Sequence, residues 1–393
     1  MRISRCRIIR HEREYREGET GLSKVPNHPH ELTVDYISGL VSELRPGVTV
    51  ESIDITEVRT YGDADSAKSV STSAQIKMDV RYGGSKSAGL PEKLLAKMSF
   101  PDDMEISNPI LDAEFENEVL FYQKIRPELD IEAPLGLGGH YDADSGRFFL
   151  LMEDISPKSP HINSMADPAD EKVVEAVLDT MARLHAGFWE SPRLKGDLSW
   201  YQNQVEGNLE KLFDGFVREH IKKEMAREVF KREFAEELGA TEAEMYAAMK
   251  AVKRHQATLP QTILHGDAHF ANSYVLPNGA GGVLDFQVSA RGFLMHDIGY
   301  YIQSSLSVEK RRKHERDLLA SYRDRLGTHG VKELPSMEML WLEYRRSMIY
   351  GFYMGWVTAP RENYGWEVMV LGNHRTKAAC IDHDSMKLIQ DIL

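Results

Sequence analysis

Two short stretches decide the fold of this chain: Leu264-His-Gly-Asp-Ala-His-Phe-Ala-Asn272 and Val283-Leu-Asp-Phe-Gln287. Strand-like residues flank both stretches, and Pro277-Asn-Gly279 between them is a turn sequence. The pattern therefore predicts a hairpin that brings the polar ends of the two stretches to one place.

Three polar residues of these stretches have the chemistry of a phosphate-handling site. Asp267, Asn272 and Asp285 offer hard oxygen atoms, and Mg²⁺ prefers a few such oxygens together with substrate phosphates. Phosphoryl transfer needs a group that positions a hydroxyl, a metal held across the phosphates, and neutralisation of charge on the transferred group. Asp267 suits the first task, as the candidate catalytic residue. Asn272 and Asp285 suit the second, as candidate metal ligands.

The spacing of these residues also resembles that of known enzyme families. The interval from Asp267 to Asn272, and that from Asn272 to Asp285, resemble the catalytic segment of protein kinases. His-Gly-Asp in place of His-Arg-Asp, and Asp-Phe-Gln in place of Asp-Phe-Gly, resemble the aminoglycoside phosphotransferase and choline kinase superfamily. With Ala182-Arg-Leu-His-Ala186 and His296-Asp-Ile-Gly-Tyr300, the chain looks closest to the ecdysteroid-kinase-like (CHK-like) branch and its bacterial relatives.

The resemblance implies an enzyme that moves the γ-phosphoryl group of ATP (or GTP), with Mg²⁺, to a hydroxyl of a small molecule. Its departures from the protein-kinase pattern, Gly266 and Gln287, point away from protein substrates and towards small alcohols.

The order of the remaining elements predicts an α+β, two-lobed protein-kinase-like fold. Strand-like runs and one helix form a small antiparallel-sheet N-lobe, and a larger, mostly helical C-lobe follows. The predicted organisation is an N-terminal arm at 1–30, a nucleotide-binding N-lobe at 31–153, and a C-lobe with the catalytic loop and the substrate site at 154–393.

A lysine in an apolar strand is the next candidate. Lys97 needs a partner, and Glu118 on the following helix could supply it; otherwise Lys97 snorkels and Glu118 is a surface acid. The resemblance implies that Lys97 binds the α- and β-phosphates and that a glutamate steadies it. Glu114 and Glu116 lie nearby, but Glu118 directly precedes Val119-Leu-Phe-Tyr122, which is similar to the family's helix.

The other candidate nucleotide contacts have weaker signals. No G-x-x-x-x-G-K-[ST] phosphate loop occurs. The 62–68 segment, with Gly62 and Ser66, is either an ordinary turn or a loop whose backbone covers the phosphates. The resemblance alone implies that the backbone at Met152, Glu153 and Asp154 contacts the adenine edge.

The bulk composition excludes several classes of protein. A net charge of −13 argues against a nucleic-acid backbone as the main partner. No apolar run of about 18 residues occurs, so no membrane span is expected. Two cysteines outside any CxxC pair fit a reducing cytoplasm. The expected partner is a small-molecule alcohol, and the sequence does not indicate an oligomeric state.

Two other functions remain open, as does the acceptor. The chain could be a catalytically silent, nucleotide-binding module of the kinase-like fold, or a metal-dependent hydrolase with His265, Asp267 and His269 as ligands. Late aromatic residues at helical spacing form either core or part of the acceptor pocket: Trp341, Tyr344, Tyr350, Phe352, Tyr353 and Trp356.

Overall fold

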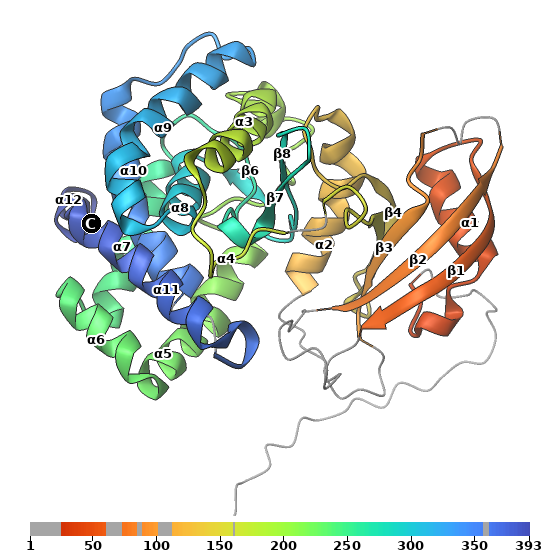
Figure 1. Cartoon of the computed structure of the whole chain (residues 1–393), viewed down its shortest axis with the longest axis horizontal. Helices are drawn as coiled ribbons and strands as arrows, with labels where there is room; N and C mark the ends of the chain where they lie inside the picture. Colours follow the sequence, from red (N-terminus) through yellow and green to blue (C-terminus); the bar gives the residue numbers. More distant parts are fainter. Residues whose placement is uncertain (1–24, 60–72, 85–88, 101–111, 160–161, 357–360) are drawn as a thin grey trace, which may run out of the picture.

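The computed structural model describes residues 25–59, 73–84, 89–100, 112–159, 162–356 and 361–393. It has two parts (Figure 1): an antiparallel sheet with a helix on its outer face, and a larger body of helices. This confirms the predicted α+β, two-lobed fold class. The predicted boundaries at residues 30 and 153 stay predictions. Residues 1–24 of the predicted arm, and both Gly62 and Ser66, lie outside the described residues.

The N-lobe sheet has five strands in the order β1-β2-β3-β5-β4, and every neighbouring pair is antiparallel. The strands are β1 (Thr49–Arg59), β2 (Ala74–Gly83), β3 (Lys93–Met98), β4 (Gly136–Asp142) and β5 (Arg147–Glu153). In this register Lys97 of β3 lies between Gln75 of β2 and Leu150 of β5.

Each face of the sheet is covered by a different helix. In β2, Ile76 and Met78 are buried and alternate with half-buried residues, as the period of two predicts. This face packs with α1 (Val34–Leu44), which begins at the predicted cap, where the Thr33 hydroxyl accepts a hydrogen bond from the Tyr36 N–H. The central strand β5 is buried on both faces, so it reads as a continuous apolar run.

The second helix of the N-lobe joins the sheet to the C-lobe. Helix α2 (Asp112–Leu120) continues as a π-helical turn at Phe121–Ile125. Its apolar side chains belong to the same core cluster as the inner face of β5 and the helices of the C-lobe. The hydrophobic core is therefore continuous from the sheet, through α2, into the C-lobe.

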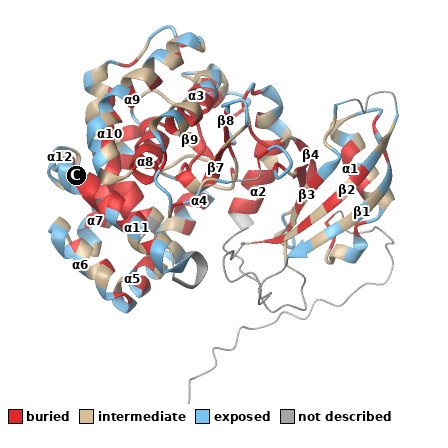
Figure 2. Cartoon of the chain, viewed as in Figure 1, coloured by how far each residue is buried: buried red, intermediate tan, exposed pale blue. Residues whose placement is uncertain are grey.

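The C-lobe is built around a helix whose residues are all buried, α8 (Met295–Ser305). Figure 2 shows α8 inside the lobe, among helices whose outer surfaces are exposed. The other helices are α3 (Glu171–Phe188), α4 (Asn208–Leu212), α5 (Arg218–Arg227), α6 (Val229–Leu238), α7 (Glu242–Gln256), α9 (Val308–Thr328), α10 (Met337–Tyr350), α11 (Arg361–Asp382) and α12 (Ser385–Ile389). None of the helices in the described ranges has the length and apolar content that crossing a bilayer requires.

Two small two-stranded sheets hold the site between the lobes. One pairs β6 (Thr262–Leu264) with β9 (Ala290–Gly292), and the other is the predicted hairpin of β7 (Ser273–Val275) and β8 (Gly281–Val283). They place the 265–272 loop and the 285–289 loop next to each other.

The structure differs from the sequence prediction in two strands and at the start of one helix. Strands β4 and β9 were not predicted, because β4 contains three glycines and β9, Ala-Arg-Gly, has no β-branched or aromatic residue. The sequence Asp167-Pro-Ala-Asp170 predicts a helix with Pro168 as its first residue, but α3 starts after Asp170, so Pro168 precedes the helix.

Candidate active site

The 265–272 loop is anchored from behind by one buried carboxylate. Asp297 accepts hydrogen bonds from the backbone N–H groups of His265 (2.6 Å) and Gly266 (2.9 Å), and from Nε2 of His185 (3.0 Å). The other nitrogen of His185 contacts the Tyr322 hydroxyl at 2.5 Å. Burial alone would raise the pKa of Asp297, but the hydrogen bond and charge of His185 outweigh burial and lower it. The anchor therefore stays ionised.

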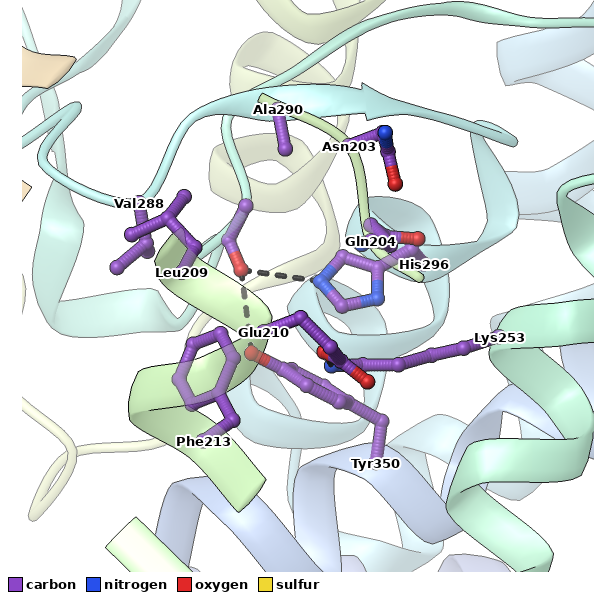
Figure 3. Close-up of a pocket in the computed structure, with 11 residues that line it drawn as sticks. Asn203, Gln204, Leu209, Glu210, Phe213, Lys253, Val288, Ala290, His296 and Tyr350 are labelled. Atoms are coloured by element: carbon purple, nitrogen blue, oxygen red, sulfur yellow. Dashed lines mark hydrogen bonds and ion pairs between the residues drawn. The ribbon is translucent and has the colours of Figure 1, made fainter. Parts of the chain in front are cut away.

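Gly266 is required by the path of the loop. Its φ is +87°, and a Cβ at this position would lie 2.0 Å from the carbonyl oxygen of Val288. The Gly266 carbonyl oxygen is also held, because it accepts hydrogen bonds from His296 Nε2 (3.0 Å) and from the Tyr350 hydroxyl (3.3 Å), as Figure 3 shows. An arginine, as in the protein-kinase pattern, does not fit at this position.

A small cavity lies behind the loop, next to these hydrogen bonds. It has a volume of about 10 Å³ and is lined by His296, Tyr350 and a buried ion pair in which Lys253 Nζ lies 2.8 Å from Glu210 Oε2 (Figure 3). This space holds at most one water molecule. We call it the rear cavity; it is too small for a substrate.

Asp267 and Asn272 are in contact on the front of the loop. The Asn272 amide nitrogen donates to the backbone oxygen of Asp267 at 3.0 Å and to its carboxylate at 3.3 Å. His269 Nε2 lies 3.6 Å from the same carboxylate, whose side chain is 30% exposed. The Asp267 carboxylate is thus fixed in direction and open to solvent on one side.

The hairpin brings Asp285 to the same end, as predicted. The Leu284 N–H donates to the Asn272 carbonyl at 3.0 Å, and His265 Nε2 donates to the Leu284 carbonyl at 2.8 Å. Asp285 has a φ of 70°, which few residues other than glycine adopt. Strained backbone of this kind is concentrated at functional sites.

The residues after Asp285 attach this loop to α2. The buried Phe286 ring stacks on Phe121 with centroids 3.8 Å apart. Asn117 of α2 donates to the backbone oxygens of Gln287 (3.1 Å) and Ser289 (2.7 Å). Helix α2 and the 285–289 loop therefore hold each other in place.

Lys97 lies between two carboxylates. Its Nζ is 2.7 Å from Glu118 Oε1 and 3.4 Å from Asp285 Oδ1. Burial alone would lower the pKa of Lys97, but the charges of Asp285 and Glu118 raise it above its usual value. The lysine is therefore a fixed positive charge beside Asp285, and the structure brings it together with the glutamate that the sequence favoured.

Glu114 also faces this site. From the sequence it was named only as a neighbour of Glu118. It lies one helical turn before Glu118, so both point from the same face of α2. Burial, together with the negative charges of Asp285 and Asp267, raises the pKa of Glu114 to about 8. The four-residue spacing between Glu114 and Glu118 is the sequence signal that would have identified Glu114 as a candidate site residue.

A larger pocket opens in front of the loop, and we call it the front pocket. It has a volume of about 240 Å³, and Glu114, Asp267, Gln287 and His220 give it polar atoms. Its apolar wall comes mainly from a π-helical turn after α4 and from the residues after α10: Phe213, Phe216, Val217, Tyr350 and Met354.

The late aromatic residues contribute mainly to the core. Tyr344, Phe352 and Tyr353 are fully buried in it, whereas Tyr350 also lines the front pocket. The side chain of Trp356 lies outside the described ones.

The predicted adenine contacts lie at the end of β5. The N–H of Glu153 donates to the Leu135 carbonyl (2.9 Å), and the N–H of Asp154 donates to the Lys93 carbonyl (3.0 Å). Met152 is buried within β5. The backbone donors of Glu153 and Asp154 are thus already used within the protein.

The histidines do not form a metal site. His265 and His296 use Nε2 to bind carbonyl oxygens, and Nδ1 of His265 accepts from the Asp267 N–H at 3.3 Å. Across the described ranges, no three His, Cys, Asp or Glu residues converge as ligands of a metal ion. The imidazoles shape the loop.

Comparison with solved structures identifies proteins with a similar fold. The chain resembles the structure of choline kinase from Cryptosporidium parvum Iowa II, with a TM-score of 0.51, 12% sequence identity, and coverage of 87% of this chain and 91% of that chain. The structure of Plasmodium vivax ethanolamine kinase gives a TM-score of 0.44 at 13% identity, with coverage of 84% of this chain and 82% of that chain. No curated protein matches the chain.

The family assignment comes from the sequence profile of a whole family. The profile described as "APH: Phosphotransferase enzyme family" matches residues 105–335, which include α2 and both loops of the site. This span is more than half of the chain. The chain therefore belongs to the APH phosphotransferase enzyme family.

Proposed function

We propose that this chain transfers the γ-phosphoryl group of ATP, or of GTP, to a hydroxyl group of a small-molecule alcohol. The position of Asp267 carries the proposal: its carboxylate is oriented by Asn272 and faces the front pocket. Membership of a phosphotransferase family supports the reaction class.

In this proposal Asp267 orients the acceptor hydroxyl and takes its proton. As the hydroxyl oxygen bonds to the γ-phosphorus, the bond from that phosphorus to the β-phosphate oxygen breaks and the nucleoside diphosphate leaves. Lys97, held at 2.7 Å from Glu118, meets the α- and β-phosphates. Because Asp285 attracts Lys97 in the free protein, nucleotide binding would have to replace that contact.

The side chains of Asn272 and Asp285 fit the proposed role of Mg²⁺ ligands. The Asn272 amide nitrogen is used by Asp267, so its amide oxygen remains as an acceptor. Burial and then the negative charges of Asp285 and Asp267 raise the pKa of Glu114, and a divalent cation would offset those charges. When bound, Mg²⁺ would neutralise phosphate charge.

The remaining nucleotide contacts are also part of the proposal. Since the N–H groups of Glu153 and Asp154 are used by Leu135 and Lys93, a base at Met152, Glu153 and Asp154 would meet their carbonyl oxygens. Gly62 and Ser66 are kept as candidate phosphate-loop residues.

The acceptor is proposed to be small. A pocket of about 240 Å³ is below the range of roughly 300–1,000 Å³ that encloses drug-sized ligands. The His-Gly-Asp and Asp-Phe-Gln sequences support placement in the ecdysteroid-kinase-like branch of the family. A silent nucleotide-binding module is disfavoured because Asp267, Asn272 and Asp285 are all present. A zinc hydrolase with His265, Asp267 and His269 as ligands is disfavoured because both ring nitrogens of His265 bind backbone groups.

The test is an ADP-release assay over a library of alcohols, sterols, aminoglycosides and amino alcohols, with Mg²⁺ and ATP or GTP. In the Asp267→Asn variant we expect kcat to fall by about a hundredfold to ten-thousandfold, because the proton acceptor is lost. The Kd for Mg·ATP, measured by calorimetry, should stay within about twofold of wild type, since Asp267 contacts the acceptor.

Asp144→Asn is the matched control, because Asp144 is exposed in the turn between β4 and β5. Its turnover should equal that of wild type. Undiminished turnover in Asp267→Asn would remove Asp267 from the reaction.

A further inference from the structure

Glu114 differs from the other carboxylates of the site because it has no hydrogen-bond or ion-pair partner among the described residues. Its side chain is 8% exposed. Within the described ranges it makes no hydrogen bond and no ion pair, whereas Glu118 and Asp285 contact Lys97 and Asp267 contacts Asn272. A polar group with so little exposure loses hydrogen bonds to water on folding, so its position calls for a partner.

The position of Glu114 shows where its partner would lie. The residue lines the front pocket together with Asp267, which is the proposed proton acceptor. The other side chains of the pocket include apolar ones, such as Phe213 and Met354, and the imidazole of His220. A molecule that places a hydroxyl at Asp267 therefore exposes a second part of itself to Glu114.

The charges around Glu114 define the chemistry of that partner. Asp267, Asp285 and Glu118 are all negative, and they act with burial to raise the pKa of Glu114. Lys97 is the nearby positive group, but Glu118 and Asp285 hold its ammonium. No described residue pairs with Glu114, so we expect its partner to come from the ligand, and the negative surroundings favour a hydrogen-bond donor over an anion.

We propose that Glu114 is a specificity-determining residue, whose carboxyl group binds a second hydrogen-bond donor of the acceptor, ammonium or hydroxyl, adjacent to the reacting hydroxyl. The apolar wall of the pocket would take the hydrocarbon part of the same molecule. This assignment rests on the proposed phosphotransferase function and names the group that the front pocket selects.

The experiment compares three acceptors that share one skeleton. They are phenylalaninol, its analogue with a hydroxyl in place of the ammonium, and its analogue with a methyl in that place. Calorimetry with Mg²⁺ and a non-hydrolysable ATP analogue gives Kd, and ADP release with Mg·ATP gives KM and kcat. We expect wild type to prefer one or both polar acceptors over the methyl analogue by about tenfold or more.

Two variants identify the role of the carboxyl group. Glu114→Leu should reduce the preference to about twofold or less, because the donor then loses its partner. Glu114→Gln should keep a preference for the hydroxyl analogue but lose a preference for phenylalaninol, since an amide binds a hydroxyl and does not neutralise an ammonium. The control Glu116→Leu, on the same helix and half-buried, should discriminate as wild type does.

The possible results distinguish the role assigned to Glu114 from the proposed phosphotransferase function. If wild type fails to discriminate among the three acceptors, or if the preference persists in Glu114→Leu, the assignment of Glu114 is wrong. If wild type discriminates but releases no ADP with any alcohol, the phosphotransfer proposal fails and the recognition role of Glu114 stands. Glu114→Leu should remain folded, because it replaces an unpartnered buried carboxyl with an apolar group.

Discussion

The rear and the front of the 265–272 loop differ in how completely their polar groups are satisfied. Behind the loop, Asp297, His296 and Tyr350 hold backbone groups, and the space left is about 10 Å³. In front, Asp267 and Glu114 line a pocket of about 240 Å³, and the negative charge of Asp267 contributes to the raised pKa of Glu114. The rear therefore contributes stability, and the front keeps charge and space for ligands at a cost in stability.

The strongest test of this comparison removes Asp297, the carboxylate that anchors the loop from behind. Asp297→Ala leaves two backbone N–H groups and His185 without their acceptor, which should cost about 3–5 kcal/mol in the free energy of unfolding. Urea denaturation measures the change. The control Asp317→Ala alters an exposed residue of α9 and should stay within about 0.5 kcal/mol of wild type. Equal stability of the two variants would show that the rear is not the stabilising side.

A second test adds a single methyl group to the loop. Gly266→Ala places Cβ 2.0 Å from the Val288 carbonyl oxygen at a φ of +87°, so we expect a loss of about 2–3 kcal/mol and of turnover. Gly239→Ala is the matched control, because Gly239 has a φ of +72° and nothing within 4 Å of the added atom. It should lose only about 1–2 kcal/mol, by the same urea measurement. A smaller loss for Gly266→Ala would mean that the loop can move away from Val288.

The third test examines the front pocket through the pH dependence of the free energy of unfolding. The pKa of Glu114 is raised from an ordinary 4.5 to about 8, so between these values the folded state holds more protons than the unfolded state. The stabilisation is complete below pH 4.5 and is lost as pH rises towards 8, with a slope of up to about 1.4 kcal/mol per pH unit. Glu114→Gln should remove this part of the pH dependence in urea denaturation from pH 5 to 8.5. Parallel curves for the two proteins would mean that Glu114 is ionised like an exposed glutamate.

Local spacing made much of the site predictable. Asn272 and Asp285 flank one hairpin, so its turn sequence is enough to align them, and Asp267 lies in the loop that leads into it. Lys97 and Glu118 were predicted as a pair, because an apolar strand cannot hold a lysine without a partner. Their roles towards a nucleotide stay predictions.

The rest depended on contacts between distant parts of the chain. His185, Tyr322 and Asp297 meet only after three separate helices have packed, so no local pattern indicates their network. That no described residue pairs with Glu114 is also a property of the folded chain. Strand β4 was missed because its glycines lack side chains to show a period, although the bulk of Leu40 of α1 leaves room for nothing larger at Gly138.

The attachment of α2 to the 285–289 loop has a consequence for cooperativity. Asn117 and Phe121 belong to the smaller lobe by sequence, yet their partners Ser289 and Phe286 belong to the larger one. Since one apolar core also runs through α2, heat should not melt the sheet and the helical body as two independent units. A substitution that weakens the smaller lobe will therefore be transmitted to the catalytic segment, and inherited variation at α2 should be constrained by both lobes together.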